Sequence, residues 1–234
     1  TTSPKSITVT RRPLLVSSPL NAVVTSSSSV QHELSPSVLE TLSTRGYVIV
    51  PNFLSQSLVN ELRQDIISLR SSGAFKQAKI GQDSTNTLNT DIRIAETCFL
   101  GRGRNELTSI TSAGGNNSIR DRSGGLYDIL DILRTSLDTI SNTNNNNGKL
   151  DPNLTELLYA YYPLGGYYRR HRDAIPNSAS VLRKYSLLLY LNDETYDPVV
   201  DGGQLRMHLD RGGDECPPEV LPDYIDVNPT GGML

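Results

Sequence analysis

Apolar residues recur at helical spacing in three segments of the first 140 residues, which predicts three amphipathic helices. The first begins at Ser35-Pro36, where an N-cap serine precedes a first-turn proline, and ends before Gly46. The second places Leu58, Leu62, Ile66 and Leu69 on one face. The third has the longest pattern and holds Leu126, Ile129, Leu130, Leu133, Leu137 and Ile140. Between these segments, residues 47–50 and 91–100 are strand-like.

After residue 154 the pattern changes to short runs rich in β-branched and aromatic residues, separated by turn signals. A tight-turn signal, Asp201-Gly202-Gly203, lies between two of the runs. A group of helices followed by a series of strands predicts an α+β domain with a β-sandwich or jelly-roll core. The expected strands are 155–162, 167–173, 185–191, 204–209 and 224–227.

The first 32 residues contain no Asp or Glu, and 13 of them are Ser or Thr. Such a segment buries too little apolar surface to offset its ordering entropy, so we expect a disordered head over residues 1–34 and a folded domain over 35–234. The composition is also compatible with the end of an organelle transit peptide, which leaves a cytoplasmic or an organellar location open. The chain starts without Met and stops within an apolar run, which predicts a segment of a longer protein.

Composition argues against several classes of partner. The formal net charge of -3 gives no sign of the clustered basic face that nucleic-acid binding needs. No apolar run approaches the length of a membrane span, so no membrane partner is expected. Cys98 and Cys216 are far apart and lack CxxC spacing, which indicates two buried or idle thiols rather than a disulfide framework.

The candidate chemistry is concentrated at His171-Arg172-Asp173. Residues two apart on an extended segment point to the same side, so this imidazole and carboxylate would face one point. They are two of the three protein ligands of a 2-His-1-carboxylate facial triad, the site of non-haem Fe(II) oxygenases. The alternative is an exposed polar turn in which the neighbouring arginines pair with carboxylates. The chain has only three histidines, so the third ligand is the open question.

Short motifs surround this pair in a defined order. They are Tyr162-Pro163, Gly166, Tyr168, His171-Arg172-Asp173, Ser186-Leu187-Leu188-Leu189-Tyr190-Leu191-Asn192 and Asp201-Gly202-Gly203-Gln204-Leu205. Upstream are Gly46-Tyr47-Val48-Ile49-Val50, Phe53-Leu54, Ser72-Gly73-Ala74-Phe75 and Asp91-Ile92-Arg93. From about Gly46 to Leu234, with interruptions at 101–122 and 142–150, the chain resembles the 2-oxoglutarate/Fe(II) dioxygenases of the prolyl 4-hydroxylase class, especially the hypoxia-sensing type.

The resemblance implies a double-stranded β-helix, or jelly roll, with flanking N-terminal helices. It implies that His171 and Asp173 are iron ligands, and that Fe(II), 2-oxoglutarate and ascorbate are needed. Two tyrosines match cosubstrate positions: Tyr190 would hydrogen-bond the distal carboxylate, and Tyr162 would lie near the cosubstrate and iron. Arg183 lies near a basic residue of the same region. Arg93 matches a position near the peptide substrate.

The family's distal iron histidine, and the basic residue that binds the far carboxylate, both follow a motif like Gly-Gly-x-Leu. Neither occurs before Leu234, and we expect that both lie beyond the chain end. The other explanation is His208, which follows Asp173 by 35 residues and aligns with an ordinary strand position. We therefore interpret His208 as a strand residue, and expect this segment alone to bind Fe(II) weakly and to show little turnover.

The function implied is 2-oxoglutarate- and O2-dependent hydroxylation, with a prolyl residue in a peptide or protein as the substrate. Two alternatives remain at the sequence level. One is a jelly-roll binding or regulatory module that has lost its metal, and the other is a small-molecule hydroxylase on the same scaffold.

Overall fold

The computed structural model describes residues 32–81, 87–100, 118–143, 149–151, 156–209 and 224–234. By its internal contacts the chain divides into Thr1–Gln31 and His32–Leu234, and the description below concerns the second unit. The expected head, residues 1–34, lies outside the described residues except for its last three positions. None of the described helices is long and apolar enough to cross a membrane.

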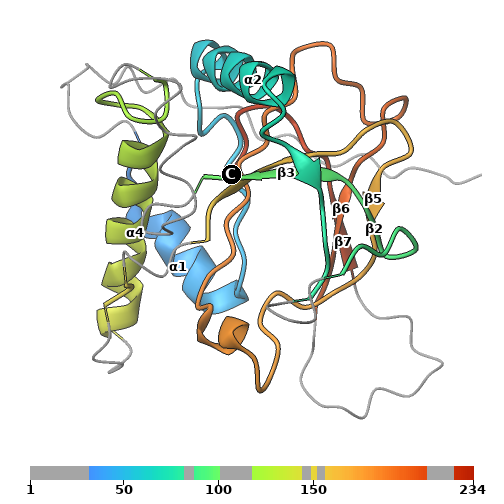
Figure 1. The fold of residues 1–234 in the computed structure, drawn as a ribbon. Coiled ribbons are helices and arrows are strands. Elements are labelled where there is room, and N and C mark those ends of the chain that lie inside the picture. The colour runs from blue at the N-terminus through green and yellow to red at the C-terminus, as the bar shows by residue number, and fades with distance from the viewer. Residues whose placement is uncertain (1–31, 82–86, 101–117, 144–148, 152–155, 210–223) are drawn as a thin grey trace, which may run out of the picture. The chain divides into compact units, whose positions relative to one another are not determined.

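The three predicted helices are confirmed as α1 (Pro36–Arg45), α2 (Gln56–Ser71) and α4 (Leu126–Thr143) (Figure 1). The first two begin at serine N-caps, whose side chains accept hydrogen bonds from the third backbone N–H beyond them. The helix α1 ends where Gly46 takes a left-handed conformation with φ 77°, a C-cap that glycine adopts readily. A short 3₁₀ helix, η3 (Ala179–Leu182), lies later in the chain.

All described strand pairs are antiparallel, so the fold combines helices with antiparallel sheets. A three-stranded sheet has the order β1 (Lys76–Gln77), β3 (Glu96–Phe99) and β4 (Leu158–Tyr161). Two further pairs join β2 (Arg93–Ile94) to β5 (Tyr167–Tyr168), and β6 (Leu205–His208) to β7 (Tyr224–Val227).

Several expected strands are shorter than predicted. The expected strand 91–100 is divided, because β2 pairs with β5 whereas β3 pairs with β1 and β4. The expected strand 167–173 ends at Tyr168. The described residues at 47–50 and 185–191 are not assigned to strands. Among the described residues their backbone hydrogen bonds are isolated ones, and they are made with the C-terminal residues 232–234.

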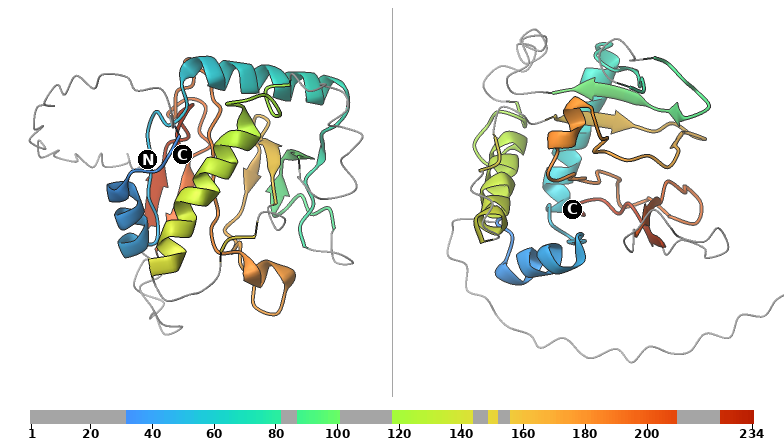
Figure 2. Two further views of the ribbon diagram at one scale, coloured as in Figure 1. Left: turned by 90° about the vertical axis from the view of Figure 1, so that its left-hand side faces the viewer. Right: turned by 90° about the horizontal axis from the view of Figure 1, so that it is seen from below.

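The C-terminal residues lie between two segments far away in sequence (Figure 2). Val50 and Leu234 exchange backbone hydrogen bonds of 2.7 and 3.0 Å. On the other side, the Tyr190 N–H donates to the Met233 carbonyl and the Gly232 N–H donates to the Tyr190 carbonyl, at 2.9 and 2.8 Å. This arrangement connects the start of the fold with the segment around Tyr190.

Gly232 allows a close approach that a side chain would obstruct. Gly232 and Gly73 have similar positive φ values, 83° and 78°. A Cβ at Gly232 would lie 2.6 Å from the Leu54 carbonyl oxygen, whereas one at Gly73 would meet nothing within 4 Å. We expect Gly232→Ala to lower the free energy of unfolding by about 1–3 kcal/mol more than Gly73→Ala, because both pay the left-handed strain and only one also clashes. Urea unfolding compares the two, and equal losses would contradict this prediction.

The core is a single cluster of buried apolar residues from α2, α4 and the three-stranded sheet. Val59, Leu62, Ile129 and Leu133 are fully buried, as the helical periodicity predicts for most of these positions. Cys98 is a buried free thiol, and Cys216 lies outside the described residues.

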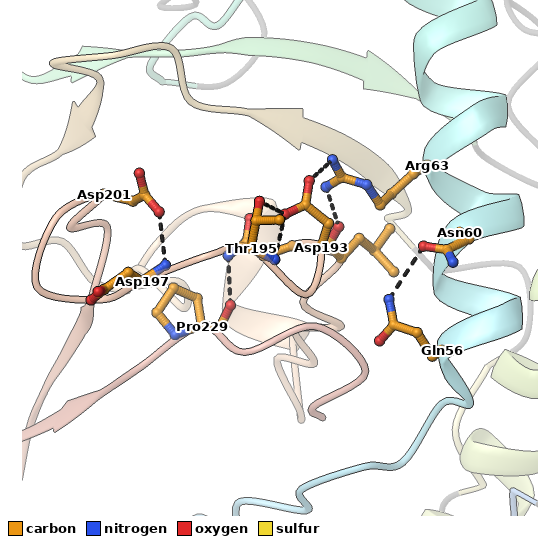
Figure 3. A network of polar contacts seen from close by, with 10 residues as sticks. Gln56, Asn60, Arg63, Asp193, Thr195, Asp197, Asp201 and Pro229 are labelled. Atoms are coloured by element: carbon orange, nitrogen blue, oxygen red, sulfur yellow. Dashed lines mark hydrogen bonds and ion pairs between the residues drawn. The ribbon is translucent and has the colours of Figure 1, made fainter.

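Polar contacts connect α2 to the segment that follows Tyr190 (Figure 3). Arg63 donates to the Leu191 carbonyl at 2.8 Å and forms an ion pair with Asp193 at 2.5 Å. Beyond them, the Asp197 N–H donates to the Asp201 carboxylate at 2.8 Å. The Val200 and Asp201 N–H groups both donate to the Asp197 carbonyl, so the turn covers residues 197–201, and Gly202 and Gly203 follow it with positive φ. The turn therefore begins earlier than the predicted Asp201-Gly202-Gly203.

Candidate metal centre

The predicted pair follows directly after β5. In the β2–β5 pair, Arg93 is opposite Tyr168, and the Arg169 N–H continues the pairing with a 2.9 Å bond to the Ile92 carbonyl. Gly166 permits the turn before β5, since a Cβ there would lie 2.8 Å from the Pro163 carbonyl oxygen. The site residues are thus held just beyond a fixed strand end.

Nδ1 of His171 is committed to the backbone. It lies 2.9 Å from the Arg169 carbonyl oxygen, and a carbonyl can only accept, so Nδ1 carries a proton whether or not Nε2 does. The other ring nitrogen, Nε2, lies 3.2 Å from Asp173 Oδ1. Tyr168 stacks on the imidazole with ring centroids 3.7 Å apart and an 18° angle between the planes. The ring is therefore oriented from two sides, with Nε2 toward Asp173.

Asp173 is held by three neighbours. His171 contacts Oδ1, the Ser186 hydroxyl donates to Oδ2, and Arg183 Nη1 lies 3.6 Å from Oδ1. The hydrogen bond with His171 is the largest cause that lowers the pKa of Asp173 to about 2, and the Ser186 bond and Arg183 charge act in the same direction. Asp173 is therefore an anion at neutral pH. The same pairing raises the pKa of His171 above its ordinary value.

The two donor atoms fit a divalent metal ion. Ligands at right angles, each roughly 2.0–2.2 Å from an ion, have donor atoms about 3 Å apart, and the observed Nε2–Oδ1 separation is 3.2 Å. The side chains keep 38% and 42% of their surface exposed, so an ion can reach them. Within the described ranges no group of three or more His, Cys, Asp or Glu residues could hold a metal, so any third protein ligand comes from elsewhere.

The predicted cosubstrate and substrate residues lie around this pair. Arg93 lies over the Tyr168 ring, with Cζ 4.4 Å from the centroid. Burial is the main cause that raises the pKa of Tyr168, and the charges of Arg93, Asp173, Tyr162 and Arg183 make smaller contributions of both signs. Tyr190 lies close enough to Tyr162 for their charges to interact, although burial is the main cause that raises the pKa of Tyr190 to about 12.

His208 is on another sheet. It lies in β6, opposite Tyr224 of β7, and the two rings are 6.2 Å apart. Its Nδ1 is buried and has no hydrogen-bond partner among the described residues. The absence of a three-member group in the described residues means that His208 does not join His171 and Asp173 there.

Two contacts of the site were not predicted. Ser186 was noted only as part of a motif, and Glu156, which accepts a 2.9 Å hydrogen bond from Arg183, was not noted at all. Alternation along the extended segment could have indicated Ser186, because Ser186 and Tyr190 are four residues apart and share a face. No local signal points to Glu156, since its contact depends on the tertiary fold.

Comparisons with known proteins find one matching superfamily and similar solved structures. Residues 157–234 match the model of the 2OG-Fe(II) oxygenase superfamily. A Pseudomonas putida prolyl-4-hydroxylase is similar in structure, with a TM-score of 0.51 and 25% sequence identity, over 84% of this chain and 82% of that chain. A prolyl hydroxylase from Trichoplax adhaerens, solved with a peptide fragment of the hypoxia inducible factor oxygen degradation domain, has a TM-score of 0.49 and 22% identity, over 84% and 74% of the two chains.

The matched residues contain His171 and Asp173 together with Tyr162, Arg183 and Tyr190. The superfamily uses Fe(II) and 2-oxoglutarate, which agrees with a donor pair of one imidazole and one carboxylate. Residues 157–234 therefore match the 2OG-Fe(II) oxygenase superfamily, and the chain is similar in structure to a prolyl-4-hydroxylase.

Proposed function

We propose that this chain belongs to a dioxygenase that hydroxylates a prolyl residue in a peptide or protein, at a non-haem Fe(II) centre held by His171 and Asp173. The observation that carries the proposal is the 3.2 Å separation of His171 Nε2 and Asp173 Oδ1, with the Nδ1 proton committed to a backbone carbonyl. The similarity to a prolyl-4-hydroxylase supports proline as the substrate. The same similarity supports the proposal that residues 35–234 adopt a jelly roll with flanking helices.

When bound, Fe(II) supplies the oxidation, in which O2 delivers one oxygen atom to a substrate C–H and the other to the succinate formed with CO2 from 2-oxoglutarate. The residues of this chain bind and orient. His171 offers the Nε2 lone pair, because its other nitrogen donates to Arg169. Asp173 offers an anionic oxygen across neutral pH, since its pKa is about 2.

Tyr190 and Tyr162 are proposed to bind 2-oxoglutarate. A pKa of about 12 keeps the Tyr190 hydroxyl protonated at neutral pH, so that it can donate to a carboxylate. Tyr162 is exposed and adjoins the same region. Arg183 is shared by two carboxylates, so a direct role in binding 2-oxoglutarate would require it to leave one of them.

Arg93 is proposed to contact the peptide substrate. Its guanidinium lies over the ring of Tyr168, and that ring stacks on the imidazole of His171. Arg93 is therefore near the proposed metal site. The guanidinium of an arginine carries several N–H donors, which could bind a carbonyl of the peptide.

The test is succinate formation by the full-length protein with Fe(II), 2-oxoglutarate, ascorbate and proline-containing peptides. We expect succinate to depend on added Fe(II), and one peptide to gain an oxygen atom at proline by mass spectrometry. Fe(II)-dependent succinate without peptide oxidation would instead favour a small-molecule hydroxylase. Absence of both iron binding and turnover would favour the binding or regulatory module, an alternative kept open by the lack of a third ligand among the described residues.

A further inference from the structure

Arg183 is divided between two carboxylates. Its Nη2 donates to Glu156 Oε2 at 2.9 Å, while its Nη1 lies 3.6 Å from Asp173 Oδ1. That same Oδ1 is the oxygen that faces His171 Nε2. The cation thus lies next to the oxygen that the proposed metal ion needs.

A guanidinium and a carboxylate prefer a different arrangement when nothing prevents it. The planar fork of an arginine matches both oxygens of a carboxylate, and such bidentate pairs are stronger than single contacts. A bidentate pair of Arg183 with Asp173 would occupy both carboxylate oxygens. It would compete directly with a metal ion for Asp173.

The structure prevents this pair from both sides. Ser186 donates its hydroxyl proton to Asp173 Oδ2, which fixes the rotation of the carboxylate and occupies the second oxygen. Glu156 holds Nη2 of Arg183, which turns one prong of the fork away. As a result Oδ1 stays directed at His171 Nε2.

We propose that Ser186 is a positioning residue for the metal site. It keeps Asp173 from forming a bidentate pair with Arg183, and Glu156 has the same effect by holding the Arg183 guanidinium. This inference rests on the proposed function, because it takes Asp173 as a metal ligand. Ser186 contacts Oδ2 of Asp173, whereas Oδ1 is the oxygen that faces His171, so Ser186 acts through the carboxylate. Its side chain is exposed, so its replacement removes the hydroxyl without creating a cavity in the core.

The test is Mn(II) titration of the full-length protein, followed by the EPR signal of free Mn(II). We expect Ser186→Ala to raise the Mn(II) dissociation constant about 10-fold. Losses of metal affinity of this size are typical when a hydrogen-bond partner of a metal ligand is removed. Ser186→Thr, which keeps the hydroxyl, should restore most of the affinity. Adding Arg183→Gln to Ser186→Ala should also recover affinity, because the competing fork is gone.

Glu156→Gln gives a second, independent measure, and we expect it to weaken Mn(II) binding in the same direction. Unchanged affinity in both Ser186→Ala and Glu156→Gln would overturn the inference. So would a double variant with Arg183→Gln that binds no better than Ser186→Ala alone. His171→Ala is titrated alongside: if Mn(II) binding does not depend on His171, the proposed iron site itself fails, whereas a His171-dependent site that ignores Ser186 contradicts only the positioning role.

Discussion

In the full-length protein, His171→Ala or Asp173→Ala should lower Fe(II)-dependent succinate formation by more than about 100-fold, which exceeds the usual effect of losing a partner of a metal ligand. The described residues bring only these two donors together, at 3.2 Å, so neither has a substitute nearby. Removing either leaves a single protein donor there. The measurement is the initial rate of succinate formation at saturating 2-oxoglutarate, with Mn(II) affinity measured in parallel.

His208→Ala is the matched control, because it makes the same substitution at the described histidine that lies on another sheet. We expect it to keep near wild-type turnover and Mn(II) affinity. A loss equal to that of His171→Ala would identify His208 as the missing third ligand. Normal turnover in His171→Ala, on the other hand, would refute the assignment of the site.

The helices were predictable because their signals are local. Ser35 and Ser55 each cap the helix that follows, and the apolar positions of α2 and α4 recur every three or four residues. These features depend on neighbours within one or two turns. They can therefore be recognised without knowledge of the rest of the fold.

The strands were less predictable because a strand needs a distant partner. Residues 91–100 were predicted as one strand, yet β2 ends at Ile94 and β3 begins at Glu96 with different partners. Those partners, β5 and β4, lie more than 50 residues away, so the choice between them is made by the tertiary fold. The segments 47–50 and 185–191 have strand composition, but within the described residues they pair only through isolated contacts such as Tyr190 with Met233.

The site shows the same division. The spacing of His171 and Asp173 was enough to predict that their side chains meet, although they lie beyond the end of β5 rather than on it. Ser186 contacts the Asp173 carboxylate from 13 residues away in sequence. Glu156 contacts the Arg183 guanidinium from 27 residues away. Contacts of that range are decided by the tertiary fold, so the sequence did not reveal them.

The buried ion pair of Arg120 and Asp65 was likewise not predicted from the sequence, although we expect its loss to lower the free energy of unfolding strongly. Arg120 is only 2% exposed, and its Nε lies 3.1 Å from Asp65 Oδ2 on α2. Burial raises the pKa of Asp65, against the opposing charge of Arg120. The pair joins the turn before α4 to α2. Burial, and then the charge of Asp65, raise the pKa of Tyr159 on β4.

Arg120→Ala should therefore lower the free energy of unfolding by about 3–5 kcal/mol, because it leaves a buried carboxylate without its cation. Arg122→Ala is the matched control. Arg122 is in the same turn and pairs with Glu61 on the same helix at 2.7 Å, but the two side chains are 45% and 41% exposed. An exposed pair contributes about 0–1 kcal/mol, so the two arginine variants should differ several-fold in urea unfolding.

The pH dependence gives the mechanism of that loss. Without Arg120 the folded-state pKa of Asp65 should rise further above its unfolded value, because burial is then no longer opposed by the charge and hydrogen bond of Arg120. A carboxyl group with a raised folded-state pKa favours the folded state when protonated, and this contribution is lost as the pH rises through the folded pKa. The stability deficit of Arg120→Ala relative to wild type should thus be largest at pH 7 and shrink as the pH falls toward about 4, the ordinary range of an aspartate. A deficit that is the same at both pH values would mean that lost packing of the arginine, and not the stranded charge of Asp65, destabilises the variant.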